Sequence, residues 1–303
     1  MKKLFFGITT ALAMVASGAA ALDTVKIDSL TGLKGKLNEK EQVYKVTFPR
    51  SDVKVVIDGW TVPPFMGLGT WAAFTGENDK AMVMGDTVLF EDEVNSAIST
   101  AIDNGLSVTA LHNHFFFDHP KVYFMHIEGE GTAERLATAV RKVYDKIKET
   151  RAASPQPKES FGSKSLPEKN SISPGPLNEI FGMSGDASNG MVKFTIGRPA
   201  KMHGVEVRKE MGVNTWIAFG GSDDNAIVDG DFAVSEDELQ SCLKALRVAG
   251  VNIVAIHSHM THEQPRILFF HYWGRGPAKG LAQAIKGALL VGGLLEVSSP
   301  VQP

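Results

Sequence analysis

The chain has 303 residues, 31 basic and 34 acidic side chains, a formal net charge of −3 and one cysteine. This slightly acidic balance argues against a nucleic-acid-binding protein, which needs a basic face, and the lone Cys242 excludes an intrachain disulfide. The length predicts about two domains of ordinary size, each with its own apolar core.

The N-terminal residues have the composition of an export signal. Lys2 and Lys3 precede an apolar run that ends in the small residues Ala19, Ala20 and Ala21. We predict a signal peptide over residues 1–21 that is cleaved after Ala21, and hence a periplasmic or secreted protein. The segment lacks a cysteine for lipidation, and no later run reaches the ~20 apolar residues of a membrane helix, so no membrane anchor is expected.

The rest of the chain contains two copies of one sequence pattern. The matched positions lie 145 residues apart for Trp71 and Trp216, Gly85-Asp86 and Gly230-Asp231, and Gly105 and Gly250, and 148 apart for Arg50 and Arg198. A period of this length indicates domains rather than the stacked units of a solenoid. We predict a first domain over 24–150, a Ser- and Pro-rich linker over 151–175 and a second domain over 176–303.

Strands and helices both occur in each copy. The expected elements, in chain order, are strands over 43–48, 53–57, 71–74 and 81–84, a helix over 91–103, two histidine-bearing strands and a helix over about 136–147. In the second copy the first helix begins at the capping-box sequence Ser235 to Glu238. The fold class is α+β: two tandem homologous domains, each a largely antiparallel sheet with two helices. Trp71 and Trp216 are expected in the core.

Six of the nine histidines form two triads with identical spacing. The triads are His112, His114 and His126 in the first copy, and His257, His259 and His271 in the second. Because side chains alternate along a strand, Val108, Ala110, His112 and His114 are expected to share an inward face. If the two strands form a hairpin around Pro120, His114 lies opposite His126, and His259 likewise opposite His271. A loop that crosses to a non-neighbouring strand is the alternative.

Three imidazoles at a fixed spacing favour a divalent metal site. Three neutral histidines and an open position are typical of catalytic zinc, although iron, copper or nickel suits the same ligands. Asp118 and Glu263 align in the loops between the histidines and are candidates for a fourth ligand or a catalytic general acid–base. Asp86 and Asp231 are weaker candidates, for which capping of a turn is the alternative.

The first copy resembles a bacterial family. Gly85-Asp86, Thr109 to His114, Pro120 and Met125-His126 are similar to the signature of the LppY/LpqO family, a largely uncharacterised group with two copies of one domain. The resemblance covers nearly the whole chain after residue 21. It implies the duplication, and it implies no particular activity.

The histidine spacing is also similar to that of the three-histidine zinc site in acetolactate decarboxylase and a related ester hydrolase. This resemblance implies that both triads are zinc ligands. In neither copy does the gap between the second and third histidines contain a Gly-Gly pair, so the substrate of those enzymes is not implied.

Three functions fit these patterns. The first is a metal-dependent hydrolase, or a lyase, acting on a small-molecule substrate. The second is a non-catalytic periplasmic protein that binds a metal ion or another ligand. The third is a structural protein whose histidines only form hydrogen bonds. The open fourth ligand position favours the first.

Overall fold

The computed structural model describes residues 21–295, so the predicted signal peptide lies outside the described residues except for Ala21. Both repeats contain the same succession of elements, which confirms the α+β class and the tandem duplication. Among the described residues, no helix combines the length and apolar composition that crossing a membrane requires.

The first repeat has three helices rather than the two expected, because a short helix precedes its first strand. Its elements are α1 (Thr24–Thr31), β1 (Lys36–Asn38), β2 (Val43–Pro49), β3 (Val56–Ile57), β4 (Trp60–Thr61), η1 (Pro64–Met66), β5 (Gly69–Gly76), β6 (Ala81–Phe90), α2 (Glu91–Asp103), β7 (Ser107–His112), β8 (Asp118–His119), β9 (Val122–Gly131) and α3 (Ala133–Ala153). Helix α3 extends three residues into the predicted linker.

The second repeat follows the same order and also begins with a short helix. Its elements are α4 (Pro174–Phe181), β10 (Asp186–Ser188), β11 (Met191–Gly197), β12 (Ala200–Met202), β13 (Val205–Val207), η2 (Lys209–Met211), β14 (Asn214–Gly221), β15 (Ala226–Ser235), α5 (Glu236–Val248), β16 (Asn252–His257), β17 (Glu263–Gln264), β18 (Ile267–Gly276) and α6 (Ala278–Val291). As its sequence predicts, α5 is capped by the Glu238 carboxylate, which accepts a hydrogen bond from Ser235 N.

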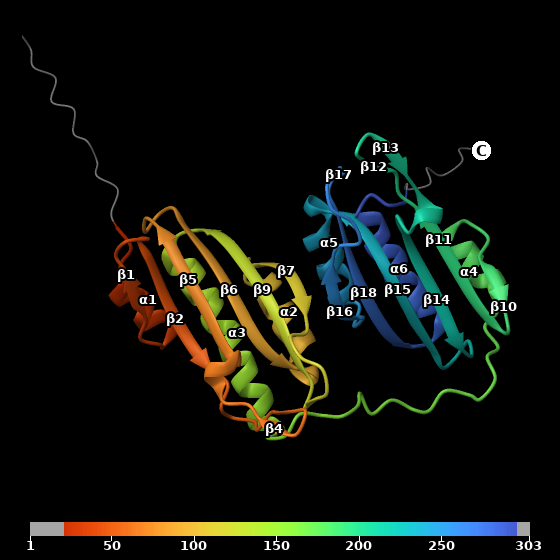
Figure 1. Cartoon of the computed structure of the whole chain (residues 1–303). Coiled ribbons are helices and arrows are strands. Elements are labelled where there is room, and N and C mark those ends of the chain that lie inside the picture. Colours follow the sequence, from red (N-terminus) through yellow and green to blue (C-terminus); the bar gives the residue numbers. More distant parts are fainter. Residues whose placement is uncertain (1–20, 296–303) are drawn as a thin grey trace, which may run out of the picture.

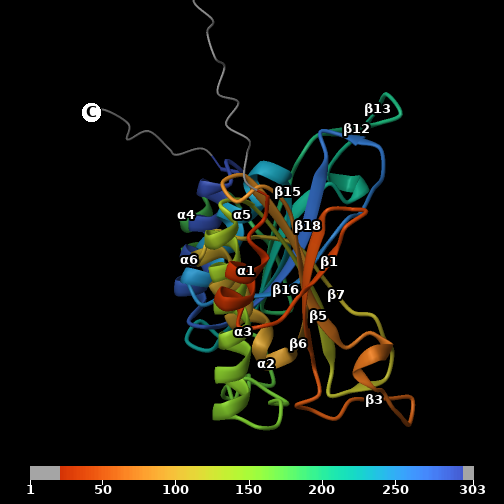
Figure 2. The ribbon, with the colours of Figure 1, turned by 90° about the vertical axis from the view of Figure 1, so that its left-hand side faces the viewer.

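The long strands of both repeats form one sheet of twelve strands, in the order β1-β2-β5-β6-β9-β7-β16-β18-β15-β14-β11-β10. All six α-helices cover the same face of this sheet, and the opposite face carries two small sheets, β4-β3-β8 and β13-β12-β17 (Figures 1 and 2). One cluster of buried apolar side chains continues between sheet and helices through both repeats. The face without α-helices, which we call the open face, carries the histidine triads.

The two repeats meet through contacts related by a pseudo-twofold axis. Leu111 of β7 pairs with Ile256 of β16, which is its own counterpart in the duplication. Asn95 of α2 donates to Ile253 O and accepts from Ile253 N, at 3.1 and 2.7 Å. Gln240 of α5, the counterpart of Asn95, bonds both Val108 N and O at 2.9 Å. A side-chain amide on a helix of each repeat therefore hydrogen-bonds to the backbone of a strand in the other repeat.

Replacing Asn95 by alanine should destabilise this interface. Ile253 N and O would lose their partner on that side of the strand, and an unsatisfied buried polar group costs about 1–3 kcal/mol. We expect a loss of that size in the free energy of unfolding, measured by urea denaturation. Gln156→Ala, in the exposed segment between the repeats, is the control. If Asn95→Ala unfolds like that control, the amide does not hold the repeats together.

Candidate metal centre

A row of side chains crosses each half of the sheet on its open face. Trp71 of β5 pairs with Asp86 of β6, which pairs with His126 of β9. The second repeat has the equivalent row Trp216, Asp231 and His271. Directly paired residues of neighbouring strands project to the same face. The third histidine of each triad therefore lies beside an aspartate.

The tryptophans of these rows were predicted to lie in the core. They lie instead on the open face and are half-buried. The ammonium group of Lys45 lies 4.1 Å from the ring centroid of Trp71, and that of Lys193 lies 4.6 Å from Trp216. A lysine stacked on each ring accounts for its partial burial without core packing.

The predicted register of the histidine hairpin is wrong, although β7 and β9 are antiparallel neighbours as expected. His126 pairs with Ala110, and His112 pairs with Phe124, so β7 ends before His114 is reached. The second repeat has the same register, with the pairs His271 and Ala255, and His257 and Phe269. The first and third histidines of each triad are thus the ones carried by paired strands, and the second lies in the loop.

Two local features cause this register. A bulge between Val108 and Ala110 interrupts the alternation, so Val108 packs in the helix-side core while His112 is on the open face. The residues after His114 then leave the main sheet, and Asp118 and His119 pair with β3 instead. The turn is therefore longer, and centred earlier, than a hairpin around Pro120.

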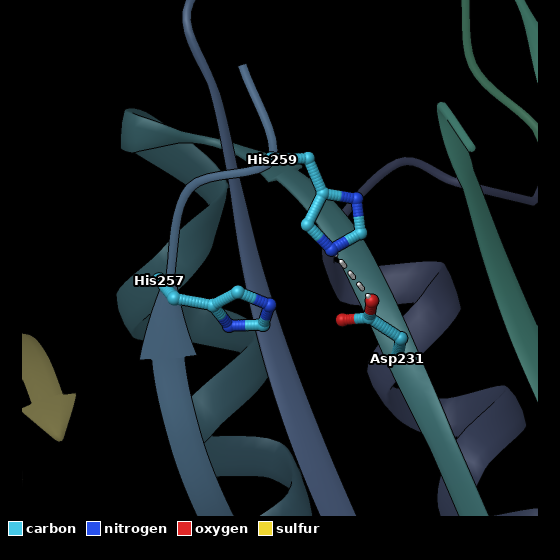
Figure 3. A group of neighbouring side chains, drawn as sticks. All are labelled: Asp231, His257 and His259. Atoms are coloured by element: carbon cyan, nitrogen blue, oxygen red, sulfur yellow. Dashed lines mark ion pairs between the residues drawn. The ribbon is translucent and has the colours of Figure 1, made fainter. Parts of the chain in front are cut away.

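In the second repeat three donor side chains converge. Oδ2 of Asp231 lies 3.3 Å from Nε2 of His259, and one donor atom each from Asp231, His257 and His259 lies within 4.8 Å of the others. Figure 3 shows the His259 ring directed at the Asp231 carboxylate, with the His257 ring beside them. The three come from β15, the end of β16 and the following loop.

His271 completes the surroundings of this group. Its ring stacks on His257 with centroids 4.8 Å apart, and its Nδ1 lies 3.2 Å from the carbonyl oxygen of Gly230. A proton on Nδ1, directed at that carbonyl, leaves the lone pair of Nε2 available for a ligand, which is the usual way a metal-binding histidine is oriented.

The first repeat brings the equivalent histidines together. Nε2 of His112 and Nε2 of His126 are 3.1 Å apart, and the His114 ring lies 5.1 Å from that of His112. His114 stacks on Phe124 with ring centroids 3.4 Å apart, and the same stacking recurs in the second repeat. Each triad is therefore one cluster, as the spacing predicts.

The geometry of the second cluster fits a metal ion, and one pair of donor atoms in the first cluster has a matching separation. Two ligand atoms about 2.0–2.1 Å from one tetrahedral ion lie about 3.3 Å from each other. The contacts His112–His126 and Asp231–His259, at 3.1 and 3.3 Å, match that separation. Among residues 21–295, the buried Oδ1 atoms of Asp86 and Asp231 have no hydrogen-bond partner. A cation would satisfy them.

Burial shifts the pKa of four groups in the two clusters. It raises the pKa of the Asp86 and Asp231 carboxyl groups, an effect that the neighbouring imidazoles oppose. Burial lowers the pKa of His114, and lowers that of His257 to about 4, with neighbouring imidazoles adding to both shifts. His257 is therefore neutral at neutral pH, which is the form of histidine that binds metal.

Asp118 and Glu263, the acids expected to act with the histidines, lie on the small sheets. Oδ2 of Asp118 accepts a 2.7 Å hydrogen bond from Val122 N, and Oε1 of Glu263 accepts one from Ile267 N at 3.2 Å. Both side chains are buried. These bonds hold the loop that follows the second histidine of each triad, and Glu263 is not part of the converging donor group.

The carboxylates that face the histidines are Asp86 and Asp231, which the sequence ranks as weaker. Asp86 interacts electrostatically with all three histidines of its repeat. The signal for both was the Gly-Asp pair at the 145-residue offset. That signal does not show that the two aspartates lie beside the histidines, because this proximity depends on the pairing of three strands.

The duplication in the structure is also what a family model recognises. The family described as Domain of Unknown Function (DUF1259) matches the chain twice, over residues 25–146 and 175–291. The chain belongs to the DUF1259 family. Each DUF1259 match contains one complete histidine cluster together with its aspartate.

Other comparisons add no function to this DUF1259 protein, and no curated protein matches it. A trimeric bacterial microcompartment shell protein, PduB, is 14% identical with a TM-score of 0.23, covering 85% of this chain and 89% of its own. Aspartate kinase from Synechocystis is 10% identical with a TM-score of 0.16, covering 75% of this chain and 42% of its own. Similarities this low carry no argument.

Proposed function

We propose that the protein is exported and that its histidine clusters hold divalent metal ions, with zinc as the preferred ion. The observation that carries this proposal is the 3.3 Å contact between Asp231 and His259 within a group of three donors. Asp231, His257 and His259 would hold the ion in the second repeat, with Nε2 of His271 beside them. Mixed imidazole and carboxylate ligands suit zinc and also iron.

We infer that this centre is catalytic, and that the protein is a metal-dependent hydrolase for a small-molecule substrate; a lyase is the second choice. The side chain of His259 is 34% exposed while that of Asp231 is 2% exposed, so one edge of the cluster is open and the rest is fixed in the sheet. When bound, zinc supplies a Lewis acid that activates water near neutral pH. The carbonyl oxygens of Gly212 and Gly230, next to the Nδ1 atoms, orient the rings of His259 and His271.

We propose that Asp118 and Glu263 transfer protons during the reaction. Oε2 of Glu263 is buried and has no hydrogen-bond partner among the described residues, so this is the oxygen left to take up or give a proton. Asp118 has the equivalent place in the first repeat. A carboxyl group within hydrogen-bond reach of the reacting atoms typically contributes about 10²–10⁴-fold to a rate.

A non-catalytic metal-binding protein is the alternative, favoured by one observation. The two repeats present the same donor types in the same register, so both would bind an ion. Equal sites suit storage or delivery of metal, whereas an enzyme needs one active centre. The resemblance to the LppY/LpqO family is consistent with either function.

Two variants separate catalysis from binding. Asp231→Asn should lower zinc affinity by at least roughly 10–100-fold, and Glu263→Gln should leave the zinc content unchanged while lowering kcat on an ester panel about 10²-fold or more. Zinc content and initial rates are measured on the same zinc-loaded samples. If wild type hydrolyses no ester, amide or phosphate ester although zinc is bound, the hydrolase proposal fails and the binding protein remains.

A further inference from the structure

A cavity of about 360 Å³ opens beside His271 where the two repeats meet. Asp229, His271 and Trp273 of the second repeat form one side of it. Helix α2 of the first repeat and Phe161, from the segment between the repeats, form the other. Its volume is within the ~300–1,000 Å³ range of small-molecule sites. Both repeats and the connecting segment are needed to build it.

The walls of this cavity are aromatic and its charged groups are acidic. Tyr123, Phe161 and Trp273 supply three rings, and Glu91 and Asp229 supply two carboxylates. Neither carboxylate has an ion-pair partner within residues 21–295. Rings and unpaired carboxylates together attract a cation, through the ring faces and through charge.

The Asn95 amide in the wall is fully engaged, and so is the amide oxygen of Asn252. Asn95 bonds both Ile253 N and O, and Oδ1 of Asn252 accepts a hydrogen bond from Arg247. The charged groups of the wall, Glu91 and Asp229, are both acceptors, so a ligand that pairs with them has to bring a positive charge.

The first repeat does not have this cavity chemistry. The positions equivalent to Asp229 and Trp273 are Met84 and Glu128, so neither the carboxylate nor the ring at those points is duplicated. Within residues 21–295, the segment that carries Phe161 has no counterpart beside the first repeat. The cavity thus lies beside His271 of the second metal cluster, for which catalysis is proposed, and not beside the first cluster.

We propose that this cavity binds a small organic cation with a flat apolar part, such as an arylalkylamine. The rings enclose the apolar part, and Glu91 and Asp229 pair with the ammonium group. Its position beside His271 makes it the substrate pocket of the metal centre, a step that rests on the proposed function. Binding of the cation itself requires no metal.

Isothermal titration tests this with two probes of similar size and opposite charge, tryptamine and indole-3-propionate. Chelator-treated wild type should bind tryptamine, and indole-3-propionate at least about tenfold more weakly. Asp229→Asn and Trp273→Ala should each weaken tryptamine binding about tenfold, and Trp273→Phe should restore most of it. Glu128→Ala, at the equivalent position of the first repeat, is the matched control and should bind like wild type.

Three results would overturn the proposal: no tryptamine binding, equal binding of the two probes, or binding that is unchanged in Asp229→Asn and Trp273→Ala. Repeating the titration with zinc-loaded protein separates this inference from the proposed function. If the cluster binds no metal, tryptamine binding to wild type persists. If the cavity proposal is wrong, zinc binding persists without tryptamine binding. Thermal melts confirm that each variant is folded.

Discussion

Replacing both His257 and His259 by alanine is expected to lower the zinc affinity of the second repeat by a factor on the order of 10³ or more. The change removes two of the three donors that converge with Asp231. Since a full set of structural zinc ligands contributes roughly 10–16 kcal/mol, the loss of two should exceed about 4 kcal/mol. Competition with a chromophoric zinc chelator measures the change directly.

The duplication supplies controls for this experiment. The double variant His112→Ala/His114→Ala should remove the first-repeat site and leave the second unchanged. His203→Ala replaces an exposed histidine in the β12–β13 turn and should bind zinc like wild type. Zinc affinity that survives the loss of His257 and His259 would contradict the assignment of the second site.

Replacing Arg50 by methionine should destabilise the first repeat by about 3–5 kcal/mol, since the change leaves a buried carboxylate with one partner fewer. Nη1 and Nη2 of Arg50 contact the Glu93 carboxylate at 2.8 and 2.9 Å. Both side chains are almost fully buried, 1% and 0% exposed. Nη1 also donates to Val88 O at 2.7 Å. Urea denaturation followed by circular dichroism measures the loss.

The equivalent pair of the second repeat provides the matched control. Arg198 contacts Glu238, but the two side chains are 18% and 24% exposed, so solvent screens their interaction. Arg198→Met should therefore cost less than about 2 kcal/mol. Equal losses in the two variants would show that burial does not set the strength of this duplicated ion pair.

The sequence predicts the general fold because its strongest signals are local. The capping residues Ser235 and Glu238 place the start of α5, and Gly105 and Gly250, just past the ends of α2 and α5, have the positive φ typical of glycine there. The 145-residue offset gives the duplication directly. The short helices α1 and α4 were missed because their eight-residue segments contain too few turns for an apolar periodicity to be recognised.

The site is predicted in its residues more than in its geometry. All six histidines of the triads lie in two clusters, because their spacing within each repeat is short. The bulge before Ala110 changes which face each side chain occupies, and it leaves no mark in the sequence pattern. Asp231 reaches His259 only through the pairing of β15 with β18 and of β18 with β16. Such non-local pairing is set by the whole sheet.

The central claim is that the histidine clusters are metal sites, and metal content tests it most directly. Protein purified without an affinity tag or a chelator is analysed by inductively coupled plasma mass spectrometry, before and after zinc titration. We predict close to one ion for each intact cluster, and loss of one ion in the His257→Ala/His259→Ala variant. Protein that carries no metal, and takes up none when zinc is added, would contradict the account.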